Sequence, residues 1–99
     1  MISRHWRGLA KRERADDYVA HLQRDTLPQL KRLAGFLGAN ILKRDVKRGV
    51  EFVIVTRWQS LDAIHGFAGA DIDTAVVAPE AREMMVEYDK RVSHYEILE

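Results

Sequence analysis

The fold is decided by V-E-F-V-I-V-T-R-W-Q-S-L-D-A-I-H-G-F, residues Val50 to Phe67. β-Branched residues fill most of its first half, which suits a pleated strand that is largely covered. Ser60 then stands where a helix N-cap belongs, because its hydroxyl can accept a hydrogen bond from a free amide of the first turn. An apolar stripe at helical spacing follows, made of Leu61, Ile64 and Phe67. The stretch therefore predicts a strand that runs directly into a short helix.

Two further strands and a long helix are predicted before this unit. Residues 2–9 read as a strand, and residues 12–33 as a helix with one apolar side. Pro28 interrupts that helix, because proline lacks an N–H and clashes with the preceding turn, so we expect a kink near residues 25–26. Residues 36–46 form the next strand, bent at Gly38, and residues 47–49 turn it into a hairpin with the strand at Val50.

The end of the chain predicts one more helix and one more strand. Pro79 opens the helix, since its fixed φ suits a first helical position. Residues 91–98 form the last strand. The inward side of the helix is expected to carry Ala81, Met84, Met85 and Tyr88.

The order of elements, β-α-β-β-α-(α)-β, predicts an α+β subunit of the ferredoxin-like class, with residues 1–99 as a single domain. One face of such a sheet carries the helices. The first, third and last strands have apolar or aromatic residues on both faces, so the second face also needs a cover. A two-fold dimer that stacks sheet on sheet would provide it, as a dimeric α/β barrel.

The composition excludes several classes of protein and of chemistry. The chain is 46% hydrophobic and 31% charged, as in ordinary globular proteins, and it has no cysteine, which excludes disulfides and thiolate chemistry. No apolar run approaches the roughly 20 residues that a bilayer span needs, and the start lacks a signal-peptide core. We therefore expect a cytoplasmic protein with no membrane partner.

Charge is unevenly distributed along the chain. Residues 1–49 hold 12 Lys/Arg and 5 Asp/Glu, a net charge of +7, whereas residues 50–99 hold 4 and 10, a net charge of −6. A basic half can bind nucleic acid, and this would require one patch formed by Lys43, Arg44, Lys47 and Arg48. The basic residues lack interleaved aromatic residues, so solvated surfaces are the better interpretation and no nucleic-acid partner is expected.

Four segments resemble the antibiotic biosynthesis monooxygenase type of dimeric α/β-barrel protein. They are I-S-R-H-W-R-G, R-W-Q-S-L-D-A-I, F-A-G-A-D-I-D-T-A-V-V-A-P-E and V-S-H-Y-E-I-L, and together they cover nearly the whole chain in order. The resemblance implies a homodimer with one pocket per subunit, between the sheet and its helices. It also implies oxidation of a small aromatic molecule, such as a phenol or anthrone, by O2 without a cofactor.

The haem-degrading branch of this fold is a poorer match. It places a tryptophan about two turns into the helix after the strand, where this chain has Gly66-Phe67. It also has a later histidine, where this chain has residues 76–78, V-V-A, and a first-strand asparagine, where this chain has residues 4–6, R-H-W. The resemblance therefore does not extend to haem cleavage.

An oxygenase of this kind needs a base, an oxyanion partner and an aromatic wall. We expect His94 or His65 to take a phenolic proton, because imidazole titrates near neutral pH, and Arg4 to stabilise the oxyanion. His5 and Arg44 are weaker candidates, and His21 is expected to be exposed to solvent. The expected substrate-binding residues are Trp6, Trp58, Asn40 and Phe67.

Two alternatives remain open from the sequence. A metal site built from His65, Asp71 and His94 lacks recognisable ligand spacing, so no metal is expected. A dimeric barrel that binds a ligand or serves a stress response without catalysis would instead have an apolar pocket that no histidine enters. Two polar groups converging on the pocket would count against that alternative.

Overall fold

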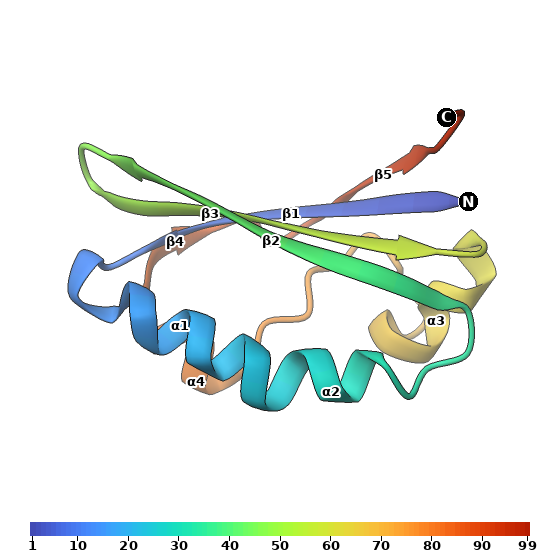
Figure 1. The fold of residues 1–99 in the computed structure, drawn as a ribbon, viewed down its shortest axis with the longest axis horizontal. Coiled ribbons are helices and arrows are strands. Elements are labelled where there is room, and N and C mark those ends of the chain that lie inside the picture. Colours follow the sequence, from blue (N-terminus) through green and yellow to red (C-terminus); the bar gives the residue numbers. More distant parts are fainter.

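The helices lie on one side of an antiparallel sheet, and the other side of the sheet carries no helix (Figure 1). This architecture is that of a computed structural model, which describes residues 1–99. The strands are β1 (Ile2–Ala10), β2 (Phe36–Val46), β3 (Gly49–Trp58), β4 (Met85–Tyr88) and β5 (Ser93–Glu96). Their order is β2-β3-β1-β4, and β5 also pairs with β1. The predicted α+β ferredoxin-like fold is confirmed.

The strand and helix predicted around Val50–Phe67 are both present. β3 is an inner strand that pairs with β1 on one side and β2 on the other, which suits its β-branched sequence. Helix α3 (Leu61–Ala68) follows after two residues. The Ser60 hydroxyl accepts a hydrogen bond from the Ala63 amide at 3.2 Å, so Ser60 is the N-cap as predicted.

The long helical segment changes its winding where the sequence predicts a kink. After a 3₁₀ turn at Arg12–Arg14 come α1 (Ala15–His21), a π-helical turn (Leu22–Thr26) and α2 (Leu27–Leu30). Pro28 explains the change, because it has no amide to donate to the preceding turn. Single π-helical turns are frequent at functional sites.

The helix predicted at Pro79 is shorter than expected. Helix α4 ends at Glu83, and Met85–Tyr88, expected to be helical, is strand β4. The segment M-V-E-Y contains Val86 and Tyr88, which favour strands, and pairing with the free edge of β1 outweighs its helical tendency. The side chains of Ala81, Met84 and Met85 are nevertheless buried, as predicted.

The interior consists of two separate apolar clusters. The smaller is formed by Leu30, Trp58 and Ile64. The larger consists of Ala10, Ala15, Tyr18, Leu22, Val50, Phe52, Ala81, Met84 and Met85. Protein interiors are normally close-packed, so a gap between two clusters marks a place where something else can bind.

Strand alternation divides the residues of β1 between the two faces of the sheet. Arg4 and Trp6 point to the helices, whereas His5 and Arg7 point to the uncovered face. None of the helices has the length and apolar character that a bilayer span requires.

Candidate functional site

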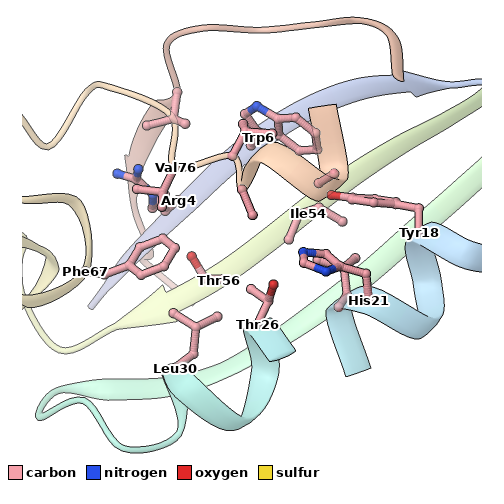
Figure 2. A pocket seen from close by; sticks show the side chains of 15 residues that line it. Arg4, Trp6, Tyr18, His21, Thr26, Leu30, Ile54, Thr56, Phe67 and Val76 are labelled. Atoms are coloured by element: carbon pink, nitrogen blue, oxygen red, sulfur yellow. The ribbon is translucent and has the colours of Figure 1, made fainter. Parts of the chain in front are cut away.

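A cavity opens between the two apolar clusters, on the helical side of the sheet (Figure 2). The cavity has a volume of about 70 Å³. One water needs about 10–15 Å³, so the cavity has room for several waters or a small ring. Aromatic side chains form much of its wall, namely Trp6, Tyr18 and Phe67.

Trp6 is held in place at two points. Its indole N–H donates to the carbonyl of Asp89 at 2.8 Å. Its ring lies over Gly8, where a Cβ atom would stand only 2.3 Å from Cη2 of Trp6. Glycine at position 8 is therefore what lets the indole lie against the sheet. Trp6 lines the cavity, as its proposed role in substrate binding requires.

Arg4 brings a buried positive charge to the cavity wall. Its Nη1 donates to the carbonyl of Ile72 and to His94, and its Nη2 donates to the carbonyl of Thr74 at 2.9 Å. Burial lowers the pKa of Arg4, which Asp73 opposes, yet a guanidinium stays protonated in proteins. Three of its five N–H groups are used, so two remain for a ligand. Phe67 also faces the charge, with its ring centre 5.7 Å from Cζ of Arg4.

His94 lies behind Arg4 and does not line the cavity. Its Nε2 is 3.0 Å from Nη1 of Arg4, and its Nδ1 is 3.2 Å from the carboxylate of Asp73. Because an arginine only donates, Nε2 must accept, and the ring is neutral with its proton on Nδ1. Both nitrogens are thus occupied, and the expected role of His94 as base is not supported by its position.

His21 lies in the cavity wall, contrary to the expectation that it is exposed. Only 5% of the residue is accessible, because α4 packs beside α1 and covers it. Its Nδ1 is 3.1 Å from a carboxylate oxygen of Glu80 and 3.3 Å from one of Asp25. Figure 2 shows the ring reaching from α1 towards the cavity. It is the histidine that lines this space.

Tyr18 lies one helical turn before His21 on the same face of α1. The two rings stack at an angle of 24°, with centres 6.5 Å apart. Burial raises the pKa of the Tyr18 phenol, so it stays protonated and can donate. Figure 2 shows its oxygen directed at the cavity.

Several expected site residues lie elsewhere. His65 is exposed on α3, where its Nδ1 is 2.8 Å from the carbonyl of Gly69. Trp58 is fully buried in the smaller cluster and donates to the hydroxyl of Thr56. Asn40 is exposed on the edge strand β2, where it accepts from Arg57. None of these three side chains lines the cavity, so their positions do not support the expected roles.

The weaker candidates also lie away from the cavity. His5 is on the uncovered face of the sheet, where its Nε2 is 2.6 Å from the Ser3 hydroxyl. Arg44 pairs with Glu51 at 2.7 Å, and Arg48 pairs with Glu87 at 2.9 Å. Two of the four cations considered for nucleic-acid binding are thus already paired with carboxylates.

The side chains that come close enough to bind a metal ion differ from His65, Asp71 and His94, the set that the sequence suggested. His21, Asp25 and Glu80 place their ligand atoms within 4.8 Å of one another. Arg24, however, donates to both carboxylates, at 2.7 Å to Asp25 and 3.1 Å to Glu80. A cationic side chain therefore already pairs with both carboxylates of this cluster.

Sequence reasoning missed His21 and the role of Tyr18. The available signal was their spacing of three residues, which places both on one helical face. His21 lies at the border of the apolar side of the helix, and only the position of Glu80 on α4, 59 residues later, shows that it is covered.

The sequence matches no known family model, and no curated protein is significantly similar to it. Its structure does resemble solved ones. A Bacillus cereus protein described as an antibiotic biosynthesis monooxygenase has a TM-score of 0.69 at 17% identity, covering 100% of this chain and 93% of that one. Another antibiotic biosynthesis monooxygenase has a TM-score of 0.70 at 17% identity, over the full length of both chains.

A Bordetella bronchiseptica protein of the same description has a TM-score of 0.69 at 17% identity, covering 99% of this chain and 97% of that one. Identities this low establish shape and no more, because one fold serves many reactions. Over the whole of its length, the chain therefore has the fold of these antibiotic biosynthesis monooxygenases.

Proposed function

We propose that the protein is a monooxygenase that oxidises a small phenolic or anthrone-like aromatic with O2 and without a cofactor. One observation carries the proposal: a single apolar cavity presents a cationic side chain, Arg4, and an imidazole, His21, between aromatic walls. Apolar walls with a few converging polar groups are typical of small-molecule sites. The names of the structures with the same fold point to the same class of reaction.

The reaction balances with the groups in the cavity and O2 alone. Loss of the hydroxyl proton makes the ring an electron-rich oxyanion, which can pass an electron to O2. The resulting radical pair forms a carbon–oxygen bond, and the hydroperoxide then loses water to leave a carbonyl. One oxygen atom enters the product, the other leaves as water, and the ring supplies the four electrons.

The protein's part is to prepare the ring for this chemistry. Arg4 places a positive charge in the cavity wall, and such a charge stabilises negative charge on the ring more in a dry pocket than in water. Trp6 and Phe67 hold the ring between their apolar surfaces. The non-catalytic alternative is less well supported, because it requires a pocket that no histidine enters.

A second copy of the chain is the proposed cover for the open face of the sheet. That face exposes Leu42 and Tyr95, which are 50% and 57% accessible. Its charges are tied to one another, since Glu51 accepts from both Arg7 and Arg44 at 2.8 and 2.7 Å. A face that exposes apolar side chains and holds its charged side chains in internal pairs suits an isologous sheet-on-sheet contact.

O2 consumption by metal-free protein tests the proposed reaction. We expect the protein to oxidise at least one member of a panel of phenols and anthrones, and the product to contain one oxygen atom from ¹⁸O₂. No oxidation is expected under anaerobic conditions. Arg4→Gln should slow it, while Arg57→Gln, a change on the opposite face of the sheet, should not. Absence of O2 uptake with every compound would reject the proposed oxygenase.

A further inference from the structure

Two polar atoms of the cavity wall have no partner in the chain: Nε2 of His21 and the hydroxyl oxygen of Tyr18. The two residues are 5% and 3% accessible, and no hydrogen bond from the rest of the chain reaches either atom. Neither atom is sealed from accessible space. Both residues line the cavity, so these two atoms are free to bind a polar atom of a ligand there.

The carboxylates behind His21 fix which of its nitrogens carries a proton. Nδ1 lies 3.1 Å from Glu80 and 3.3 Å from Asp25, and a carboxylate only accepts, so Nδ1 bears the hydrogen. Nε2 is then the nitrogen with the free lone pair. A hydrogen bond from Arg24 holds the pKa of Asp25 below its usual value, so this carboxylate stays ionised.

The pair is complementary to a phenolic hydroxyl. Such a group donates its hydrogen to the lone pair of His21 and accepts a hydrogen bond from Tyr18. After the proton has moved, the oxyanion still accepts from Tyr18, and the imidazolium faces the carboxylates of Glu80 and Asp25. The arrangement follows the general pattern in which a carboxylate orients a histidine base.

We propose that His21 is the proton acceptor of this cavity for an aromatic hydroxyl, that Tyr18 donates to the resulting oxyanion, and that Glu80 and Asp25 are positioning residues. In this step the O–H bond of the ligand breaks and its electron pair stays on oxygen. The proton forms a bond to Nε2 of His21. The assignment deepens the proposed oxygenase function and rests on it for the identity of the site, but the proton transfer itself needs no O2.

Other assignments fit the contacts less well. Both nitrogens of His94 are occupied, and His65 and His5 lie outside the cavity. A metal held by His21, Asp25 and Glu80 would have to displace Arg24 from both carboxylates. If His21 served only to link α1 to α4, its Nε2 would have no hydrogen-bond partner.

A phenol that reports its own ionisation tests the proposal. 4-Nitrophenol is yellow as the phenolate and colourless as the phenol, so its ionised fraction can be read directly at a pH where the free probe is half ionised. We expect wild-type protein to bind the probe and raise the yellow fraction. In His21→Phe, with a ring of similar size, the affinity for phenolate should fall roughly 10-fold or more, as for loss of a hydrogen bond to a charged group.

Matched variants separate a chemical role from a structural one. Glu80→Gln should lower the yellow fraction, whereas Glu83→Gln, on the same helix but unpaired in the structure, should leave it unchanged. Tyr18→Phe should weaken phenolate binding while His21 is intact, and it provides a second test if His21→Phe fails to fold. Circular dichroism and urea titration verify folding in each case.

The outcomes distinguish this proposal from the oxygenase proposal. A raised yellow fraction that depends on His21 supports the assignment even if no phenol consumes O2. An unchanged yellow fraction in both folded His21→Phe and His21→Gln overturns it, as does full O2 uptake by those variants. A yellow fraction that appears only after addition of Zn²⁺ also overturns it, in favour of a metal site.

Discussion

Arg4 and His94 share a hydrogen bond in which the histidine must be neutral: Nη1 of Arg4 lies 3.0 Å from Nε2 of His94. A proton on Nε2 would place two cations in contact on the buried side of β1. Burial lowers the pKa of His94 from its usual value near 6.5, Arg4 lowers it further, and Asp73 opposes both. The contact that excludes His94 as a base therefore also predicts a pH-dependent stability.

The free energy of unfolding should fall as the pH drops through the ordinary histidine range. Below about pH 6.5 the unfolded chain protonates residue 94, whereas the folded chain, with its lowered pKa, does not, so acid favours unfolding. Urea titrations at pH 7.5 and 5.5 measure the effect. His94→Gln should show a smaller loss than wild type, and His65→Gln, a change at an exposed histidine, should behave like wild type. Equal losses in all three proteins would refute this assignment.

Two glycine substitutions should have opposite effects. Gly8→Ala puts a Cβ atom 2.3 Å from the Trp6 ring, which must move and give up its bond to Asp89. Forced repacking of this kind costs typically 1–3 kcal/mol of stability. Gly66→Ala in α3 has its nearest neighbour at 4.0 Å and should stabilise by up to about 1 kcal/mol.

The same two glycine variants should also differ in how well the cavity binds 4-nitrophenol. Displacement of Trp6 should also weaken the binding of 4-nitrophenol by Gly8→Ala, while Gly66→Ala should bind it as wild type does. Thermal unfolding and absorbance titration provide the two measurements. Unchanged binding in a folded Gly8→Ala protein would show that Trp6 does not shape the cavity.

A hydrogen bond beneath the cavity makes Thr56 a stability residue. Its hydroxyl accepts from the indole N–H of Trp58 at 2.9 Å, and Trp58 is fully buried. Thr56→Val keeps the shape but leaves that N–H unpaired, which costs about 1–3 kcal/mol. Thr26→Val, at another threonine of the wall with no such partner, should cost less. Urea unfolding compares the two, and equal losses would contradict the importance of this bond.

The fold could be predicted from the sequence because the residues that determine its elements act locally. β-Branched residues, the Ser60 cap and Pro28 act within a few positions, and each is found where it was predicted. The segment Met85–Tyr88 was mispredicted because its state depends on the free edge of β1, about 75 positions earlier in the chain. Local helical tendency cannot reveal such a partner.

The site could be predicted only in part, because several of its contacts join residues far apart in the sequence. Alternation along β1 places Arg4 and Trp6 on one face, so they could be selected together. His94 and His65 were plausible by residue type. The hydrogen bond between His94 and Arg4 is a tertiary contact that the local sequence does not reveal, whereas His65 bonds to Gly69, four residues later. His21 became identifiable only when α4 was seen to bring Glu80 beside it.

The proposed dimer predicts that a charge on the open face separates the subunits. Val55 lies at the centre of that face, paired with His5 on one side and Asn40 on the other. Sedimentation should find wild type as a dimer at micromolar concentration, and Val55→Asp as a folded monomer, because an isologous contact would place the two new carboxylates near each other. Leu61→Asp is the matched control: it puts the same charge on an exposed leucine of α3, on the helical side. A monomeric wild type, or a Val55→Asp protein that remains dimeric, would mean that this face is not the subunit contact.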